Sequence, residues 1–435
     1  MFYKHTKKNI RFLLLISFVF AGVVNSAEFD YAVEFGLTSY DNVNLLNESA
    51  GKEQSYSLRG LLLYREDTSW HNTEISLDAT YLDYKENIVD DEIDASLIAQ
   101  STIVINPTLF EWYVSNVFSR ITIDPLEGAS SDNLINTNAF QTGPNIFFRL
   151  NKSNNLNFRI RIEDYIFEES LIEDANNTRL TSAADVIHRF NSSSSLSLNF
   201  ELGIVDYADE SINSNYQRGD GYLGFDYERS IYRFNLETGY TNIVFDDKSL
   251  DEVREPRYLL SIRADRTRIS NTGLELFQTT TDTSNSLLDQ LNSDFSTANN
   301  ASINSDLYRN TGGNVSYGRN TTGSNLRVRF DYLETRYNTL KDFNLDAYGV
   351  DVQFDSNINS TSGIAFNARY YQSTYLELSD DRIDTDTLYS LSYRLRLRRT
   401  INFRFTLEDE SRNSTVEVQS YDDFRIRLSL EYVSL

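Results

Sequence analysis

Residues 156–163 read Leu-Asn-Phe-Arg-Ile-Arg-Ile-Glu, and this regular alternation indicates the fold class. The even-numbered residues of the stretch are apolar and the odd-numbered ones, including Arg159 and Arg161, are polar. Successive side chains of a β-strand point to opposite faces, whereas a helix has a period of 3.6 residues and would mix the two sets. The stretch therefore predicts an amphipathic strand with one apolar and one polar face.

The same alternation recurs from one end of the chain to the other. No stretch after the N-terminal region is apolar enough to span a membrane as a helix. The chain therefore consists mainly of amphipathic strands. Clear examples are residues 29–37, 196–202, 326–332, 364–370 and 424–432.

The connections between these strands alternate between short polar turns and longer acidic segments. Turns are expected near residues 106–107, 151–154, 191–194, 228–230, 355–360 and 398–400. Longer connections are expected at residues 39–54, 120–138, 246–252 and 281–304. This asymmetry predicts an all-β fold, a transmembrane up-and-down antiparallel β-barrel of about 20 strands (18–22), with both termini periplasmic.

The alternative to a membrane barrel is a water-soluble β-sandwich, whose polar face would lie in bulk water. Aromatic residues near the expected strand ends, such as Trp112, Phe148 and Tyr232, favour the barrel. Rings at these positions are typical of the two membrane interfaces. General β-propensity of aromatic residues explains part of this pattern.

The N-terminal residues have the order of features found in a secretory signal. Residues 1–11 carry four basic and no acidic residues, residues 12–24 are almost entirely apolar, and Ser26 and Ala27 are small. We therefore predict a cleaved signal peptide at residues 1–26 and a single barrel domain at residues 27–435. The localisation that follows is the outer membrane of a Gram-negative bacterium. Expected partners are membrane lipid, lipopolysaccharide and the outer-membrane assembly machinery, with no nucleic acid.

Side chains for covalent or metal chemistry are scarce. The chain has no cysteine, and His71 and His188 are the two histidines after the signal. A zinc site or a histidine-based catalytic group is therefore not indicated. Acidic clusters in the long connections lack the spacing of a calcium loop. We expect no enzyme activity, no cofactor and no metal.

Arginines are concentrated on the polar faces of the C-terminal strands. Removal of residues 1–26, which contain four basic and no acidic residues, would change the formal net charge from −24 to −28. Either carboxylates compensate these arginines, with Glu28, Asp30 and Glu34 of the first strand as candidates, or an anionic solute does. We predict a lumen-lining, anion-contacting set consisting of Arg394, Arg396, Arg404, Arg425, Arg427, Arg159 and Arg161. Arg398 is expected on the same face as Arg394 and Arg396.

The segment that follows the first strand resembles a known family. Residues 40–45, Tyr-Asp-Asn-Val-Asn-Leu, are similar to the opening of the β-barrel porin 2 group. The resemblance implies an outer-membrane barrel associated with exopolysaccharide or PEP-CTERM export systems, with export components as further partners. It covers the N-terminal strand and loop, and elsewhere only the strand rhythm.

These observations favour a porin-like protein. We expect passive diffusion or export of hydrophilic solutes, with anionic or polysaccharide-related solutes as candidates, through an arginine-lined lumen. The alternative is a plugged structural or docking barrel in an envelope or exopolysaccharide-export complex, without conductance.

Overall fold

The computed structural model describes most of the chain and contains twenty β-strands. It describes residues 27–49, 51–124, 126–127, 133–168, 175–209, 214–267, 269–285, 306–377 and 382–434. The predicted signal at residues 1–26 lies outside these ranges. The strands are β1 (Ala27–Tyr40), β2 (Glu53–Asp67), β3 (His71–Tyr84), β4 (Glu92–Asn106), β5 (Phe110–Thr122), β6 (Leu134–Arg149), β7 (Asn154–Phe167), β8 (Asn177–Asn191), β9 (Ser194–Tyr207), β10 (Tyr216–Arg229), β11 (Tyr232–Phe245), β12 (Val253–Thr267), β13 (Ser270–Thr281), β14 (Tyr308–Asn320), β15 (Ser324–Tyr337), β16 (Leu345–Asn357), β17 (Ser362–Tyr375), β18 (Ile383–Arg398), β19 (Ile401–Ser414) and β20 (Tyr421–Val433).

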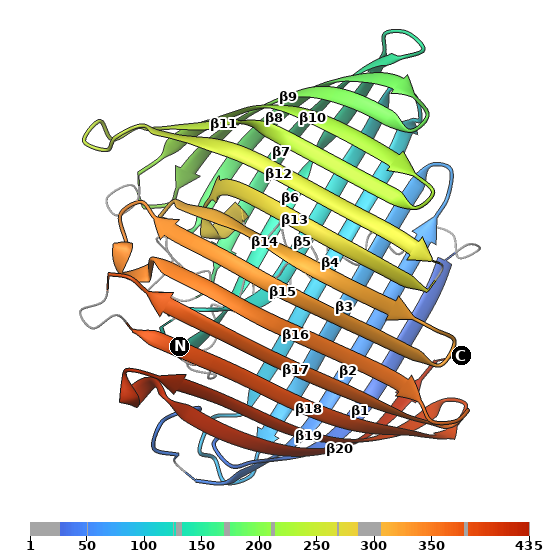
Figure 1. Ribbon diagram of the computed structural model, residues 1–435, viewed down its shortest axis with the longest axis vertical. Coiled ribbons are helices and arrows are strands. Elements are labelled where there is room, and N and C mark those ends of the chain that lie inside the picture. The colour runs from blue at the N-terminus through green and yellow to red at the C-terminus, as the bar shows by residue number, and fades with distance from the viewer. Residues whose placement is uncertain are drawn as a thin grey trace, which may run out of the picture.

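The strands form one closed antiparallel barrel (Figure 1). Each strand pairs with its neighbours in sequence, and β1 closes the ring by pairing with β20, with Ala32 opposite Val433 and Tyr40 opposite Arg425. Closure leaves no strand at an open edge of the sheet, which a sheet in lipid requires. The predicted up-and-down barrel of about 20 strands is confirmed.

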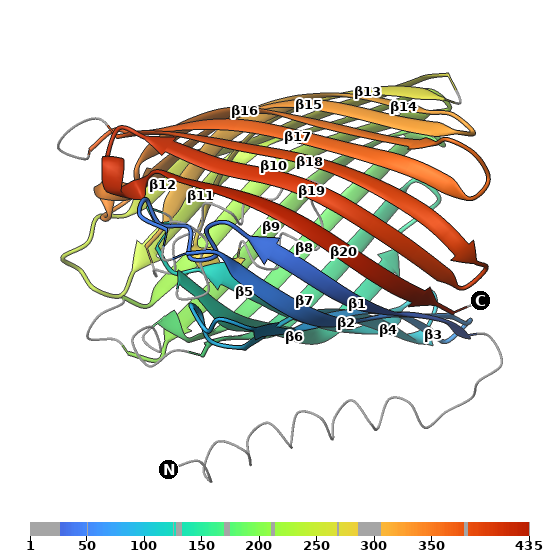
Figure 2. The ribbon, with the colours of Figure 1, turned by 90° about the horizontal axis from the view of Figure 1, so that it is seen from below.

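The two rims of the barrel differ in the length of their connections (Figure 2). One rim, called the turn rim here, has short turns such as residues 192–193, 230–231 and 399–400. The other, the loop rim, has longer connections, including residues 246–252 and 282–307. β1 begins and β20 ends at the turn rim. A periplasmic position of the turn rim remains a prediction.

The outer face of the wall is apolar and exposed. Phe35, Ile160 and Leu202 are 55%, 41% and 65% exposed, whereas Glu34 and Glu163, on the opposite face, are 7% and 4% exposed. A water-soluble protein would have the reverse arrangement, so the exposed apolar face is the lipid-facing surface of a transmembrane barrel. None of the helical segments in the described ranges has the length and hydropathy needed to span a bilayer.

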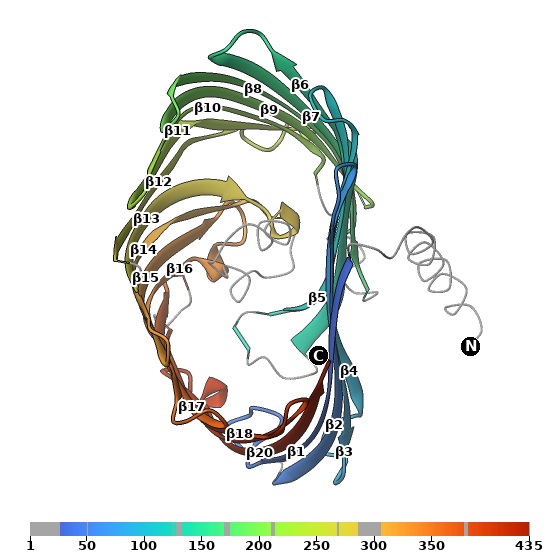
Figure 3. The same ribbon diagram turned by 90° about the vertical axis from the view of Figure 1, so that its right-hand side faces the viewer.

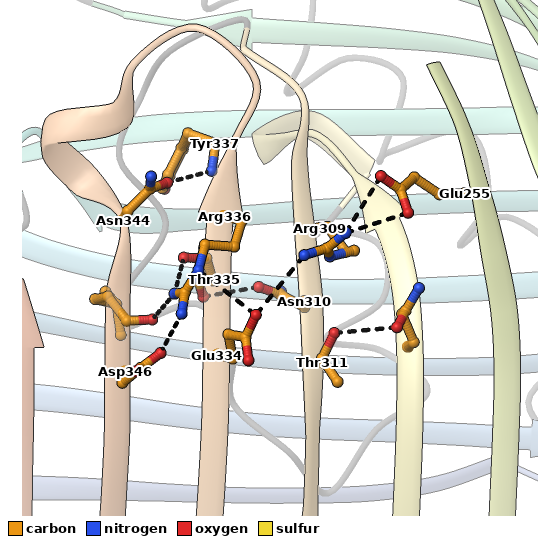
Figure 4. A network of polar contacts seen from close by, with 12 residues as sticks. Glu255, Arg309, Asn310, Thr311, Glu334, Thr335, Arg336, Tyr337, Asn344 and Asp346 are labelled. Atoms are coloured by element: carbon orange, nitrogen blue, oxygen red, sulfur yellow. Dashed lines mark hydrogen bonds and ion pairs between the residues drawn. The ribbon is translucent and has the colours of Figure 1, made fainter. Parts of the chain in front are cut away.

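The wall has a gap in its backbone pairing near the loop rim. The ladder between β12 and β13 ends at Tyr258 and Gln278, and β13 then separates from β12 while it stays paired with β14 as far as Thr281. Arg309 of β14 reaches Glu255 of β12 across this gap, at 3.3 Å. Ion pairs therefore link strands where the backbone ladder is missing. The same network continues through Glu334, Arg336 and Asp346 (Figure 4).

Candidate functional site in the barrel lumen

The predicted arginine set lies on the lumenal face of the wall. On β18, for example, Tyr393 and Leu395 are on the outward face. Arg394 and Arg396 alternate with them and therefore point inward. Arg394 lies directly opposite Arg404 in the register, which places Arg404 on the same face. The C-terminal members of the set are Arg394 and Arg396 on β18, Arg404 on β19, and Arg425 and Arg427 on β20.

Arg398 does not continue this face as expected. A bulge between Arg396 and Arg398 pairs Arg398 with Ile401, whose side chain belongs to the outward set. A bulge inserts one extra residue and so breaks the alternation. The shared inward face of β18 therefore ends at Arg396.

Arg425 is neutralised by three carboxylates. Its guanidinium forms ion pairs with Glu408 at 3.0 Å, with Glu410 at 2.6 Å and with Asp423. It also lies 5.8 Å from the centre of the Tyr40 ring. Arg425 therefore holds the wall together and contributes no net positive charge to the lumen.

The carboxylates that compensate Arg425 are not those suggested by the sequence. The register places Glu34 of β1 opposite Glu431 and not opposite an arginine. Within the described residues, neither Glu28, Asp30 nor Glu34 forms an ion pair with β20. The partners come from β19 and from β20 itself, because cross-strand register sets which charges meet.

The other C-terminal members of the predicted set have no carboxylate partner within the described parts of the chain. Arg427 donates to the Thr38 hydroxyl at 3.3 Å, and Arg394 donates to the Asn357 side-chain oxygen at 3.5 Å. We call this set, Arg394, Arg396, Arg404 and Arg427, the arginine wall. It occupies the half of β18–β20 nearest the turn rim.

Arg159 and Arg161 lie on another part of the lumenal surface and make structural contacts. Arg159 pairs with Asp185 at 3.3 Å. Arg161 donates to the Pro144 carbonyl at 3.1 Å and to Asn145, and lies over the Tyr113 ring at 4.8 Å. These contacts fix both side chains against the wall of β5–β8.

A charge separation runs along β18–β20. Toward the loop rim, Arg412, Arg425 and Arg382, which directly precedes β18, pair with five carboxylates. These are Asp384, Asp386, Glu408, Glu410 and Asp423. The turn half contains the arginine wall and Glu431, which accepts a hydrogen bond from Asn402 at 3.1 Å. The lumenal face of these strands is therefore acidic toward the loop rim and basic toward the turn rim.

A buried contact that sequence analysis missed anchors the end of β13 inside the barrel (Figure 3). Asp282, just after β13, pairs with Arg179 of β8 at 2.8 Å, and both side chains are 1% exposed. Tyr216 of β10 donates to the same carboxylate, and Asn177 donates to Ser284 at 2.9 Å. These bonds hold residues 282–285 against the lumenal face of β8 and β10.

The environment of Asp282 keeps it ionised. Burial alone would raise the pKa of this carboxyl, but the Arg179 charge and the hydrogen bond from Tyr216 hold the pKa below its usual value. The ion pair is therefore present at neutral pH.

A second inward contact comes from the connection between β5 and β6. Arg382 donates to the Leu126 carbonyl, and the Leu126 side chain packs against a cluster formed by Leu345, Ala347 and Tyr375. Leu126 lies between β5 and β6, whereas the cluster belongs to β16 and β17. The two anchors, Arg179–Asp282 and Arg382–Leu126, hold two connecting segments inside the lumen, in the half of the barrel nearest the loop rim.

Two cavities lie against the lumenal wall. The larger, of about 860 Å³, is bordered by β11–β15 and includes Arg257, Arg263, Arg327 and Arg329 as well as Glu237 and Glu275. The smaller, of about 570 Å³, is formed by the β14–β15 and β16–β17 turns together with Arg394 and Arg404.

The two histidines after the predicted signal lie apart, on the outward faces of β8 and β3. His188 faces outward, 2.7 Å from Asn154 and against the Phe190 ring. His71 lies 2.6 Å from the Thr73 hydroxyl and 3.0 Å from the Ser101 hydroxyl, also on the outward face.

His71 also lies 3.6 Å from the Glu66 carboxylate, measured from its other ring nitrogen. Thr73 is 3% exposed, whereas Ser101 is partly exposed. Among the residues that the structure describes, no group of histidine and acidic side chains could hold a metal.

Comparison with known proteins gives structural likeness only. No family model matches the sequence, and no curated protein matches it. Among solved structures, OpdO from Pseudomonas aeruginosa is 10% identical, with 95% of this chain and 98% of that chain covered and a TM-score of 0.40. A BenF-like porin from Pseudomonas fluorescens Pf-5 is 9% identical over 95% and 100%, with a TM-score of 0.43. The FrpB iron transporter from Neisseria meningitidis (F5-1 variant) is 7% identical over 94% and 83%, with a TM-score of 0.47. Such values carry no inference about function.

Proposed function

We propose that this protein is an outer-membrane channel for small hydrophilic solutes, with a preference for anions. The closed wall with an apolar, exposed outer face supports the membrane location. The observation that carries the preference is the arginine wall, whose four guanidinium groups have no carboxylate partner within the described residues.

Unpaired fixed charge in a confined lumen attracts counter-ions. Low-dielectric walls focus the field and raise the local concentration of the opposite charge. Rings and ladders of arginine act as anion-selectivity devices in pores. The arginine wall would therefore favour anions over cations of the same size.

The second candidate is a structural or docking barrel without conductance. The specific observation in its favour is the pair of inward anchors, Arg179–Asp282 and Arg382–Leu126, which bring chain into the lumen. The resemblance at residues 40–45 implies an association with exopolysaccharide export. We propose this association for the channel and for the docking barrel alike.

Osmotic swelling of liposomes containing the purified protein tests the channel directly. We expect faster uptake of glucuronate than of glucosamine, which has opposite charge and similar size. Replacement of Arg396, Arg404 and Arg427 by glutamine should reduce or reverse this preference, and replacement of all three by lysine should keep it. No swelling with either solute, from protein shown to be folded, would favour the docking barrel.

A further inference from the structure

Arg394 and Arg404 lie directly opposite each other on two adjacent, paired strands. The register of β18 and β19 places them directly opposite, with both side chains on the lumenal face. Directly opposed residues have Cβ atoms about 4.5–5.5 Å apart, and like charges at this separation destabilise a sheet. Neither arginine forms an ion pair within the described residues, in contrast to Arg425 on the next strand.

The repulsion between these arginines is not relieved by the surrounding protein. Arg396, the next inward residue on β18, adds a third positive charge and lies opposite Asn402. Asp355 contributes a carboxylate to the same cavity but forms no ion pair with either arginine in the described structure. The local balance therefore remains positive.

The space in front of the pair is a polar cavity of about 570 Å³. Its lining is rich in amides and hydroxyls, and Asn357 accepts a hydrogen bond from Arg394 at 3.5 Å. Such a volume lies in the range of small-molecule sites. Representative lining residues are Asn320, Thr321, Ser324, Asn325, Ser356 and Ser392.

We propose that this cavity is a binding site for a small organic dianion, held between the Arg394 and Arg404 guanidinium groups. Each guanidinium can donate two parallel N–H bonds to a pair of anionic oxygens. A solute with two negative charges satisfies both groups and removes the like-charge repulsion, whereas a monoanion satisfies only one. The surrounding amides and hydroxyls suit the polar remainder of the solute.

This inference deepens the proposed anion channel by assigning it a solute class and a discrete site. Two solute types share the required chemistry, a phosphate monoester and a dicarboxylate. Both present anionic oxygens to two separate guanidinium groups. Isothermal titration with phosphate and with succinate distinguishes them.

Isothermal titration of the folded, detergent-solubilised protein tests the site independently of conduction. The probes are inorganic phosphate, succinate and acetate, at equal ionic strength and mildly alkaline pH. We expect saturable binding of phosphate, of succinate or of both, and much weaker binding of acetate. The stronger of the two dianions identifies the solute type. Equal binding of acetate and both dianions, or no saturable binding, would overturn the proposal.

Variants localise the binding to the arginine pair. Arg394→Gln and Arg404→Gln should each weaken dianion binding roughly tenfold or more, as expected for the loss of a hydrogen-bonded charge. Arg404→Lys keeps the charge but lacks the planar fork, and should bind at an intermediate strength. Arg65→Gln is the matched control, because Arg65 lies on β2 and pairs with Glu74 at 2.9 Å. Equal losses in Arg65→Gln and Arg404→Gln would place the binding elsewhere.

The two proposals can fail separately. Dianion binding without conductance would support the site and contradict the channel. Anion-selective conductance without saturable dianion binding would support the channel and overturn the site.

Discussion

Arg404 and Arg425 lie on neighbouring strands and face the same lumen, yet their charges have different consequences. Arg425 is matched by Glu408, Glu410 and Asp423, so its charge stabilises the wall. Arg404 has Arg394 opposite it and no carboxylate partner in the described residues. A single residue type thus serves structure at one position and is available for a solute at the other.

Sequence reasoning reached only part of this distinction. Alternation along one strand correctly gives the face on which a side chain lies, as for Arg404 and Arg425. It does not give the register between strands, and the partner of each charge depends on register. The expected partner Glu34 was therefore wrong, because it lies opposite Glu431.

The lipid-facing assignment of single residues can be tested on β7. Ile160 is outward and 41% exposed, whereas Arg161 points inward. Arginine at the lipid-facing midplane costs about 2–4 kcal/mol, so Ile160→Arg should reduce the assembled fraction. Arg161→Ile should assemble nearly as well as the unchanged protein. Heat-dependent mobility in gel electrophoresis measures the assembled fraction, and equal behaviour of the two variants would place β7 outside the wall.

At the scale of elements, strand number and turn positions were predictable, but inward departures from the wall were not. Period-two alternation marks a strand wherever one face meets lipid. The end of β13 separates from β12, and Thr280, Thr281 and Asp282 are 3%, 5% and 1% exposed inside the barrel. Their sequence has no pattern that separates a lumenal segment from an ordinary polar loop. The contact between Asp282 and Arg179 joins residues that are 103 positions apart in the sequence, so no local pattern reports it.

The anchor between Asp282 and Arg179 should control the mobility of the segment after β13. Asp282→Asn leaves Arg179 without its buried partner, a change that typically costs about 3–5 kcal/mol. Hydrogen exchange at residues 282–285 should increase in this variant, while exchange in β18–β20 should not change. Unchanged exchange at residues 282–285 would mean that the ion pair does not hold the segment.

The same anchor predicts a pH dependence. The pKa of Asp282 is lowered in the folded protein, so the stabilisation is fully present above the ordinary aspartate pKa. It is lost only as the pH falls through the lowered value. After correction for intrinsic rates, hydrogen exchange at residues 282–285 should therefore not change with pH near neutrality. It should increase under strongly acidic conditions, where Asp282 becomes protonated and the ion pair is lost.

For the whole molecule, the two rims define an orientation in the membrane. Short turns at one rim and long connections at the other are typical of barrels with periplasmic turns and extracellular loops. An epitope inserted at Ser249, in the β11–β12 connection, should be labelled on intact cells, whereas one at Ser193, in the β8–β9 turn, should not. The opposite labelling pattern would invert the barrel.

The central claim for the whole molecule is that the arginine wall makes a conducting lumen selective for anions. The reversal potential of the unchanged protein in a planar bilayer, under a salt gradient, is the most direct measurement. We predict a reversal potential whose sign reports a preference for anions. The preference should become smaller as the salt concentration rises, because the Debye length falls from about 10 Å at 0.1 M to about 3 Å at 1 M. A reversal potential of the opposite sign would show that the acidic loop half governs permeation and that the arginine wall does not.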